Sequence, residues 1–567
     1  MRRAWLILAL LALLGCGAPA TTEVAMRTTD QAAGSDPSAE PVDLGPTAAE
    51  EQVQFSVSLR LPGAAALDEY LAGLTSPGSR HYRQYLRPAE FGARFGLDDE
   101  ELGRVVGWLE QGGMEVAASP QRTSLAVSGH AAEVNRLLGI TLVDRQNANG
   151  ERFHRPVGVP SVPGDVRGDV AAILGLDTEP LIEPALGGIL AAGVGADGLL
   201  PATVARAYEI EPLHAAGLHG QEQSVAIVSF DTYTPSDVDL FDERQGIDSP
   251  PVELVRLDGA RTEPGPGTGE VALDIQVIRG IAPQARIINY EGPNSADGFA
   301  GIINRIVADD QVRIVSISWG LCENHAGQST LEAMQREFAA AFAAGISVFA
   351  ASGDDGAYDC RRVQISADPF ERDLSLSVDW PASSPSVVGV GGTFLSTRQD
   401  GTYIEEAGWE EPLGGGGGGG GLSRFQQRPD WQRGPGVDNS TSNGMRQVPD
   451  VAGPADPTSG FFIVYTEPSE GVVAGRVGGT SAAAPFWAGS MLLTQQLAQQ
   501  QGVEALGAIG PTLYEIAAEQ PTGAVFHDII RGGNLLFSAG PGWDYSTGLG
   551  TPRVAPLAQA IVDRLSE

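Results

Sequence analysis

Short apolar runs separated by turn-forming residues dominate the chain after residue 200. Runs of this length predict strands that are buried on both faces of a sheet. Amphipathic helical patterns lie between them, the clearest over residues 331–342 with Gly345 at its end. This alternation predicts a doubly wound α/β domain over residues 201–567. The predicted strands are residues 225–230, 286–290, 313–318, 346–351 and 387–390.

The stretch over residues 53–185 has a different pattern. Apolar and polar residues alternate over 53–61, which predicts a strand. Asp98 can cap a helix that two glycines at 112–113 end. Two further strand-like runs and a second helical pattern follow, so we predict a compact α+β unit of ferredoxin-like type without an obvious catalytic cluster. Residues 186–200, rich in glycine, alanine and leucine, predict a linker where a protease could cut.

The N-terminus has the pattern of an export signal. Two arginines precede the apolar run 4–14, which is too short to span a bilayer, so residues 1–15 are predicted to be a signal peptide. The run ends in LLGC, which resembles a bacterial lipobox with Cys16 as the lipidated residue; the alternative is an ordinary signal peptide with an incidental cysteine. Residues 16–52 lack periodicity and are predicted to be a disordered tether.

These features predict an exported protein. We expect a lipoprotein of the bacterial cell envelope, at the outer membrane or the surface, or an extracellular protein after processing. The membrane contact would be a lipid anchor only. We expect a monomer.

Composition excludes several classes of function. The chain has 567 residues, with 36 Lys and Arg against 71 Asp and Glu, a formal net charge of −35. Such a chain is poorly suited to nucleic acid, which requires cations against phosphates, or to electrostatic adhesion to anionic lipid. A hydrophobic content of 42% excludes wholesale disorder. Seven His and three Cys argue against a multi-zinc protein.

Two cysteines besides Cys16 are disulfide candidates. Cys322 follows the predicted strand 313–318, and Cys360 follows the predicted strand 346–351. If these strands are parallel neighbours, both cysteines lie at one edge of the sheet, and export permits a disulfide. The alternative is two unpaired thiols.

Ser481 is a candidate nucleophile. It lies in GGTSAAAP, residues 478–485, where an apolar helix begins. Free N–H groups and the helix dipole at this end favour negative charge, which suits a serine that forms an acyl-enzyme beside a developing oxyanion. The alternative is a plain N-cap serine.

A serine nucleophile needs a base, and the usual histidine motif, His-Gly-Thr, is absent from the sequence. Glu270 and Asp274 are four residues apart, so on a helix their carboxylates face one another. If buried, they would share a proton, which raises one pKa and lets a glutamate act as a general base in acid. The alternative is two solvated carboxylates.

Asp354 is a candidate for the oxyanion site. It comes just after the predicted strand 346–351, at the carboxyl edge of the sheet where active sites of doubly wound domains lie. A protonated aspartate can donate a hydrogen bond to an oxyanion. The alternative is an Asx turn, which Gly353 and Gly356 favour.

Together these segments resemble the sedolisin, or serine-carboxyl peptidase, family, and especially its kumamolisin-type members. The first region resembles the activation prodomain of that family. The resemblance implies a subtilisin-like doubly wound parallel sheet after a ferredoxin-like α+β prodomain. The other matching motifs are SISWG at 316–320, WPASSP at 380–385, VGGT at 390–393 and RQVPDV at 446–451, with SPGS at 76–79 and PAEF at 88–91 in the first region.

The resemblance implies a role for each candidate. Ser481 would be the nucleophile and Glu270 the general base and later the acid. Asp274 would orient Glu270, and Asp354 would donate to the oxyanion. Because Asp354 must be protonated to donate, such a site should work in acid and fail near pH 7.

The implied activity is that of an endopeptidase that cleaves proteins and peptides. It would be made as a self-processing proenzyme, cut within about residues 180–200, with its own prodomain as inhibitor or folding aid. One alternative is a non-catalytic surface lipoprotein that uses the fold as a binding module. The other is an exopeptidase that removes tripeptides from N-termini.

The C-terminal region resembles the calcium site of the family. Asp528 and Asp544 would bind one structural Ca²⁺ through their side chains, and Ile529, Gly540 and Gly542 through their carbonyls. The alternative is an ordinary Gly/Pro loop.

Two features depart from the family pattern. Gly414–Gly421 is a run of eight glycines, which by composition alone predicts a flexible linker; the family has a shorter Gly-rich stretch here, near the substrate cleft. Asp355 stands where family members often carry a small residue, which could alter the surroundings of Asp354.

Overall fold

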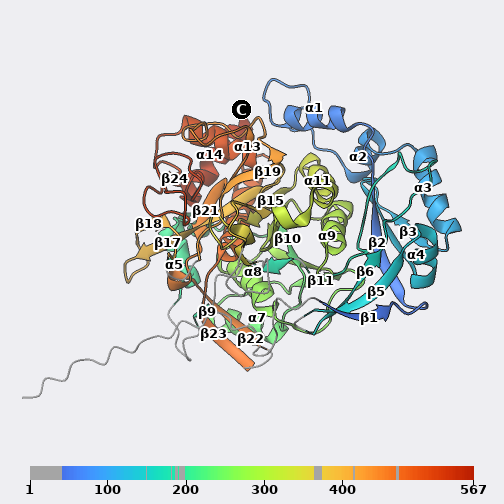
Figure 1. The fold of residues 1–567 in the computed structure, drawn as a ribbon. Coiled ribbons are helices and arrows are strands. Elements are labelled where there is room, and N and C mark those ends of the chain that lie inside the picture. Colours follow the sequence, from blue (N-terminus) through green and yellow to red (C-terminus); the bar gives the residue numbers. More distant parts are fainter. Residues whose placement is uncertain are drawn as a thin grey trace, which may run out of the picture.

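The computed structural model describes residues 41–147, 150–180, 182–184, 189–190, 198–362, 373–412, 416–467 and 471–567. Figure 1 shows a smaller N-terminal region, blue to cyan, packed against a larger α/β region. The predicted signal peptide and Cys16 lie outside the described residues. None of the described helices is both long enough and apolar enough to cross a membrane.

The N-terminal region contains an antiparallel sheet with helices against it. The strand order is β3-β4-β2-β7, and a second sheet has the order β1-β5-β6. Asp98 caps α3, accepting from the Glu101 N–H at 2.8 Å. The elements are β1 (Val42–Pro46), β2 (Gln52–Leu59), α1 (Ala64–Leu74), α2 (Pro88–Phe95), α3 (Asp99–Gln111), β3 (Glu115–Ala118), β4 (Ser124–His130), α4 (Ala131–Leu138), β5 (Thr141–Gln146), β6 (Arg152–Val157) and β7 (Val170–Leu174).

Strand β1 corrects the predicted tether. Residues 42–46 fall inside the predicted disordered stretch 16–52, yet they pair antiparallel with β5. The sequence pattern missed this strand because it has only five residues, with Gly45 and Pro46 at its end, and is stabilised by a distant partner.

The larger region is built on one mostly parallel sheet. Its order is β11-β12-β10-β13-β15-β17-β18, with β21 also paired to β17. Only β18 runs antiparallel to its neighbour. The five predicted strands correspond to β10, β12, β13, β15 and β17, and the sequence missed β11, β18 and β21. The strands are β10 (Ser224–Ser229), β11 (Glu253–Arg256), β12 (Arg286–Glu291), β13 (Ile314–Ile317), β15 (Ser347–Ala351), β17 (Val388–Thr397), β18 (Tyr403–Gly408) and β21 (Val451–Pro454).

Two pairs of helices position the functional parts. Helix α8 packs against α12, and α12 also packs against β13, β15 and β17. Helices α9 and α11 pack together and against strands β2 and β7 of the N-terminal region. The larger region's helices are α5 (Pro201–Ala207), α6 (Glu211–Ala215), α7 (Pro235–Gln245), α8 (Thr268–Ile281), α9 (Ala296–Asp309), α10 (Glu323–Ala326), α11 (Gln328–Ala343), α12 (Thr480–Gln500), α13 (Gly510–Glu519) and α14 (Val554–Ser566).

Short strands surround this sheet, and two of them come from the chain that connects the regions. Residues 183–184 and 189–190 form β8 and β9, and Leu199 exchanges hydrogen bonds with Gly460 and Phe462. The predicted linker over 186–200 therefore contains paired strand residues. The short strands are β8 (Glu183–Pro184), β9 (Ile189–Leu190), β14 (Trp319–Cys322), β16 (Asp379–Trp380), β19 (Gly421–Gln427), β20 (Met445–Val448), β22 (Phe461–Glu467), β23 (Gly471–Val477), β24 (Phe526–His527) and β25 (Thr551–Pro552).

A polar cluster joins the two regions. Glu337 of α11 is buried and accepts hydrogen bonds from the hydroxyls of Thr123 at 2.7 Å and Ser124 at 2.9 Å. Asn304 of α9 also donates to Glu337, at 3.0 Å. Burial raises the pKa of Glu337 to about 7. Directional hydrogen bonds therefore contribute to the contact between the two regions.

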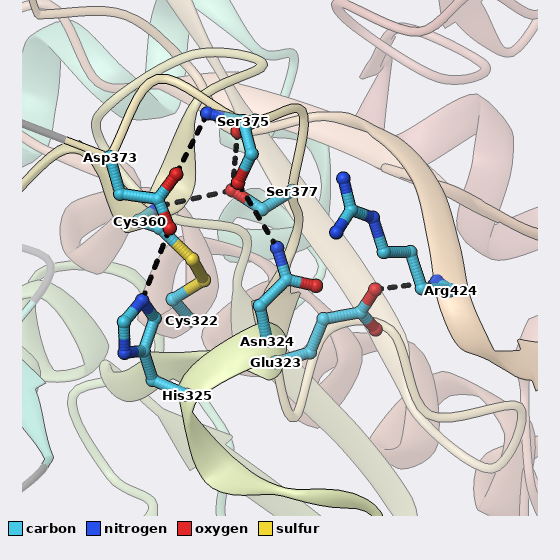
Figure 2. The surroundings of a disulfide bond; sticks show 9 residues. All are labelled: Cys322, Glu323, Asn324, His325, Cys360, Asp373, Ser375, Ser377 and Arg424. Atoms are coloured by element: carbon cyan, nitrogen blue, oxygen red, sulfur yellow. Dashed lines mark hydrogen bonds and ion pairs between the residues drawn. A yellow bond between two sulfur atoms is a disulfide. The ribbon is translucent and has the colours of Figure 1, made fainter.

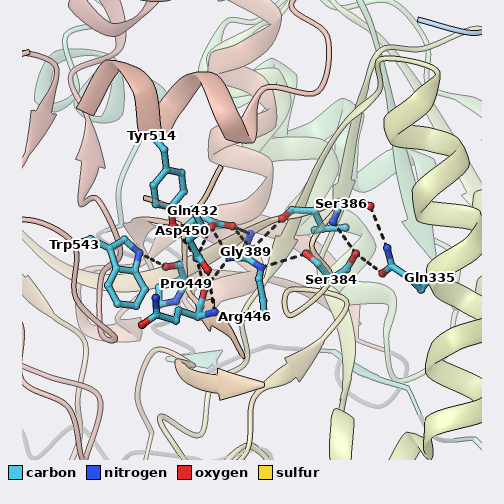
Figure 3. Close-up of polar contacts among 12 residues, drawn as sticks. Gln335, Ser384, Ser386, Gly389, Gln432, Arg446, Pro449, Asp450, Tyr514 and Trp543 are labelled. Atoms are coloured by element: carbon cyan, nitrogen blue, oxygen red, sulfur yellow. Dashed lines mark hydrogen bonds and ion pairs between the residues drawn. The ribbon is translucent and has the colours of Figure 1, made fainter. Parts of the chain in front are cut away.

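The RQVPDV motif forms a buried ion pair (Figure 3). Arg446 and Asp450 are both fully buried, and the guanidinium bonds the carboxylate through two nitrogens, one at 2.7 Å. Tyr514 and the Gly389 N–H donate to the same carboxylate, each at 2.8 Å. The pair thus holds β20 and β21 to the start of β17.

Candidate active site

Ser481 lies in the first turn of α12 and is fully buried. The preceding Gly479 has φ of 112°, a conformation that favours glycine. The Ser481 hydroxyl donates to the carbonyl oxygen of Ser318 at 3.1 Å. The predicted nucleophile is therefore held at the carboxyl end of β13, as the doubly wound sheet led us to expect.

Glu270 and Asp274 lie one turn apart on α8, and both are buried, with exposed fractions of 1% and 0%. The alternative of two solvated carboxylates is therefore wrong. Burial raises the pKa of Asp274 to about 8. Asp274 therefore keeps its proton through acid and neutral pH.

Ser318 joins the acidic pair to the nucleophile. Its hydroxyl lies 2.6 Å from Asp274 Oδ1 and 3.0 Å from the Ser481 carbonyl oxygen. One hydroxyl has one proton, so it donates to only one of these acceptors at a time. The sequence does not reveal this role, although Ser318 stands in SISWG at the end of a buried strand, where functional groups gather.

Asp354 follows β15 and is 3% exposed. Its Oδ1 accepts from the Thr480 N–H at 2.8 Å and from the Thr480 hydroxyl at 2.9 Å. The structure therefore places this carboxyl against the residue that precedes Ser481.

The glycine run packs behind Asp354. The Gly417 N–H donates to the Asp354 carbonyl at 2.9 Å, and the Gly419 N–H to the Gly353 carbonyl at 2.7 Å. The Ser352 hydroxyl donates to the Gly419 carbonyl at 2.7 Å. Gly417–Gly421 is buried, so the flexible-linker interpretation is wrong for these residues. Glycine is needed because two backbone segments approach too closely for side chains.

A disulfide joins the two strand ends near the site. Cys322 ends β14, Cys360 lies in the 3-10 turn Asp359–Arg362, and their Cα atoms are 5.2 Å apart (Figure 2). The predicted disulfide depended on the two preceding strands being parallel neighbours, and β13 and β15 are. His325 and Asp373 lie close to Cys360, but the disulfide occupies the sulfur, so this group offers no thiolate to a metal.

Two acidic groups surround this disulfide. Buried Glu323 accepts from the Ser423 hydroxyl at 2.7 Å and the Arg424 N–H at 2.6 Å, and burial raises its pKa to about 7. Asp355, the departure from the family pattern, forms an ion pair with Arg361 at 2.7 Å. This pair ties the residue after Asp354 to the turn that contains Cys360.

Asp528 and Asp544 converge on one turn, as a shared cation site requires. The Gly542 N–H donates to Asp528 at 3.0 Å, and the Gly540 N–H donates to Asp544 at 3.0 Å. Ile529 is buried directly after Asp528. Two carboxylates beside one turn are hard oxygen donors, so these two side chains fit Ca²⁺.

Two described segments of the chain that leaves the N-terminal region lie beside the site. Strand β8 pairs antiparallel with β14, with Pro184 opposite Trp319 and Glu183 opposite Gly320. Strand β9 pairs antiparallel with β23, which ends four residues before Ser481. Described segments of the same chain therefore lie on the strands that follow Ser318 and precede Ser481.

Comparisons with known proteins agree with this geometry. The model "Pro-kumamolisin, activation domain" matches residues 40–179, and "Subtilase family" matches residues 260–509. Kumamolisin from a Bacillus species is 34% identical, over 93% of this chain and 94% of its own. Sedolisin from a Pseudomonas species is 29% identical, over 91% and 88%.

More distant and structural relatives point the same way. Tripeptidyl-peptidase sed5 of Aspergillus fumigatus is 26% identical, over 88% of this chain and 92% of its own. A solved structure of Pseudomonas sedolisin, a serine-carboxyl proteinase with two bound pseudo-iodotyrostatin molecules, has a TM-score of 0.56 at 29% identity; it covers 65% of this chain and 99% of that one. The subtilisin-like sheet, the α+β prodomain and these matches establish that the chain belongs to the sedolisin family of serine-carboxyl peptidases.

Proposed function

We propose that this peptidase is an acid-active endopeptidase in which Ser481 is the nucleophile, with Glu270 and Asp274 as its acid–base pair. The observation that carries the proposal is the buried chain of contacts from Asp274 through Ser318 to Ser481. A binding module would have no need to bury two carboxylates beside a serine, because burial without a function only costs stability.

We infer the following reaction for these residues. The Ser481 hydroxyl leaves the Ser318 carbonyl and attacks the substrate carbonyl carbon, while Glu270 takes its proton. The bond to the leaving amine breaks as Glu270 returns the proton to that nitrogen, which leaves an acyl-enzyme. Water then hydrolyses the ester by the same proton transfers in reverse order.

Asp354 would stabilise the oxyanion that forms in each step. Its Oδ1 accepts from Thr480, so the proton that Asp354 donates to the oxyanion would be on Oδ2. Only the protonated carboxyl can donate, and for that reason we expect activity in acid and its loss near neutral pH.

The path of the connecting chain favours an endopeptidase. Strand β8 lies on β14 and strand β9 on β23, so polypeptide is accommodated on two edges that flank Ser481. A tripeptidyl-peptidase would need an end wall beyond three residues on one side. That activity is the second candidate, supported by the likeness to tripeptidyl-peptidase sed5.

We also propose self-processing between Pro184 and Ile189. Pro184 is the last residue of β8 and Ile189 is the first residue of β9. The cut would therefore fall between the two segments that pair with β14 and β23. The cut would separate the prodomain, which would serve as inhibitor or folding aid.

One structural Ca²⁺ is proposed for the C-terminal site. Asp528 and Asp544 would hold it by side chain, with the carbonyls of Ile529, Gly540 and Gly542. The ion would neutralise two carboxylates on one turn and thus stabilise the fold.

Export and a lipid anchor at Cys16 remain proposals from the sequence. They are supported by the basic start, the apolar run 4–14 and the LLGC ending. Palmitate labelling of the wild-type chain and of Cys16→Ser in a bacterial host tests the anchor; equal labelling of both would contradict it.

The first experiment compares the wild-type chain without its signal segment with Ser481→Ala. Both are shifted from about pH 7.5 to about pH 4 with calcium, and chain mass and casein digestion are followed together. We expect the wild type to shorten and digest casein, with a new N-terminus between Pro184 and Ile189, and the variant to do neither. If Ser481→Ala digests casein equally well, the proposed mechanism is wrong.

A second comparison separates the two peptidase modes. A peptide with a blocked N-terminus has no free amine for a tripeptidyl-peptidase to recognise, whereas an endopeptidase cleaves it internally. Mass analysis of products from blocked and free forms of one peptide therefore distinguishes them. Release of tripeptides from the free form alone would favour the second candidate.

A further inference from the structure

Ile182 of the connecting chain is held at both of its backbone polar groups by one side chain. The Ile182 N–H donates to Asn294 Oδ1 at 3.1 Å, and Asn294 Nδ2 donates to the Ile182 carbonyl at 2.8 Å. A side-chain amide has an acceptor and donors in one plane, so it can pair with a peptide as a neighbouring strand does. Asn294 thus binds the backbone of the residue at this position, whichever side chain that residue has.

The loop that contains Asn294 is fixed on both sides. The Gly292 N–H donates to the Ser229 carbonyl at 3.0 Å, which ties the loop to β10. The Ser295 hydroxyl accepts from the Gly298 N–H at 3.0 Å and so caps α9. Asn294 is therefore presented by a rigid scaffold, as a preformed subsite requires.

The contact continues the strand pairing at the active site. Ile182 directly precedes Glu183 and Pro184, which lie opposite Gly320 and Trp319 of β14. Three consecutive residues are therefore held by main-chain contacts. Any extended peptide can make such contacts, because they use only backbone atoms.

The side chain of Ile182 indicates which type of residue this position selects. It is 3% exposed and belongs to a buried apolar cluster that contains the core of the catalytic region and also residues of the N-terminal region, among them Leu174. Burial in such surroundings stabilises the binding of an aliphatic side chain, whereas a charged side chain would lose its hydration.

We propose that Asn294 and the apolar site that receives Ile182 form a substrate subsite, which binds an aliphatic residue two positions before the residue opposite Trp319. The proposal rests on the proposed peptidase function and adds the class of substrate: extended chains that reach this subsite with an aliphatic side chain. In the uncleaved chain the connecting segment occupies the subsite, and after processing it is open to substrates.

The test uses enzyme activated from the full chain and two peptides with the chain's own sequence. The long peptide has the sequence of residues 179–190, and the short peptide, that of 183–190, lacks the position of Ile182. We expect Asn294→Ala to lower kcat/KM for the long peptide about tenfold, mostly through KM, because two hydrogen bonds are lost. The short peptide, which does not reach Asn294, should change less than about twofold.

Three results decide the matter. An equal loss for both peptides would assign Asn294 a structural role and overturn the proposal, as would no loss for either. Casein digestion is measured on the same samples. If the enzyme digests casein normally and Asn294→Ala changes kcat/KM for neither peptide, the subsite is rejected but the proposed function is not. Absence of Ser481-dependent digestion of casein and of both peptides rejects the proposed function and the subsite with it.

A second measurement needs no enzyme variant. In the long peptide, the residue at the position of Ile182 is replaced by Val or by Asp and tested on wild-type enzyme. We expect Val to retain most of kcat/KM and Asp to lower it at least tenfold. Equal rates for the three peptides would show that no apolar site is there.

Discussion

The glycine run behind Asp354 leads to a sharp prediction, that Gly419→Ala disables the enzyme. Gly419 is buried against the loop that carries Asp354, through its N–H to Gly353 and its carbonyl to Ser352. A Cβ on Gly419 would collide with the carbonyl group of Ser352 and lie only 3.0 Å from the Gly353 carbonyl oxygen. Both neighbours are backbone, so no side chain can rotate away.

The size of the effect follows from the shift that this collision forces. To restore ordinary contact, the two segments must separate by on the order of 1 Å, and a displacement of that size at reacting groups costs about 100-fold in rate. Asp354 is the residue after Gly353, so it moves with them. We therefore expect kcat to fall at least about 100-fold, which is about 2.7 kcal/mol of transition-state stabilisation, and overpacking to cost about 1–3 kcal/mol of stability.

Gly416→Ala is the matched control from the same run. Its added Cβ would meet only side-chain atoms, the nearest being the Trp409 ring at 3.3 Å. Activity against a blocked peptide and the urea midpoint are measured for both variants after acid activation. Wild-type kcat in Gly419→Ala would show that the run does not position Asp354, and equal losses in both variants would show that the run is only generally sensitive.

Three further predictions concern charge. Buried Asp274 keeps its proton up to about pH 8, whereas the unfolded chain releases it near pH 4, so stability should fall as pH rises between these values; in the Ser481→Ala background, Asp274→Asn should bring the urea midpoints at pH 4 and 7.5 closer together. Arg446→Met strands the buried Asp450 carboxylate and should cost about 3–5 kcal/mol by urea unfolding, while Arg433→Met, from an exposed pair, should change little. Removing calcium with EDTA should lower the unfolding temperature reversibly, and an unchanged temperature would contradict the proposed ion.

The sequence predicted the central strands because burial on both faces leaves continuous apolar runs. Strands at the edges of the sheets were missed, because they contain too few residues, or too few apolar ones, to produce a recognisable hydrophobic pattern. Strand β11 has the burial pattern of a largely exposed edge, and β1 depends on pairing with β5, about a hundred residues away. Local pattern contains no information about such partners.

The candidate site divides along a similar line. Glu270, Asp274, Asp354 and Ser481 could be predicted because their motifs occur together in an order that resembles one family, although each motif alone also has a structural interpretation. Ser318 does not stand out, because a serine at a strand end is common and its importance comes from two acceptors on distant segments.

Parts of the site that are made of backbone are the least visible in sequence, for a physical reason. A glycine run is compatible with a flexible linker and with a close-packed segment, since both require the absence of side chains. What separates the two is whether other backbone lies within reach, and that is a property of the fold. The contacts of Gly417 and Gly419 with the Asp354 loop settle this for the described part of the run. Asn294 is the same case on the substrate side, because an amide that pairs with main chain leaves no complementary residue in the sequence to reveal it.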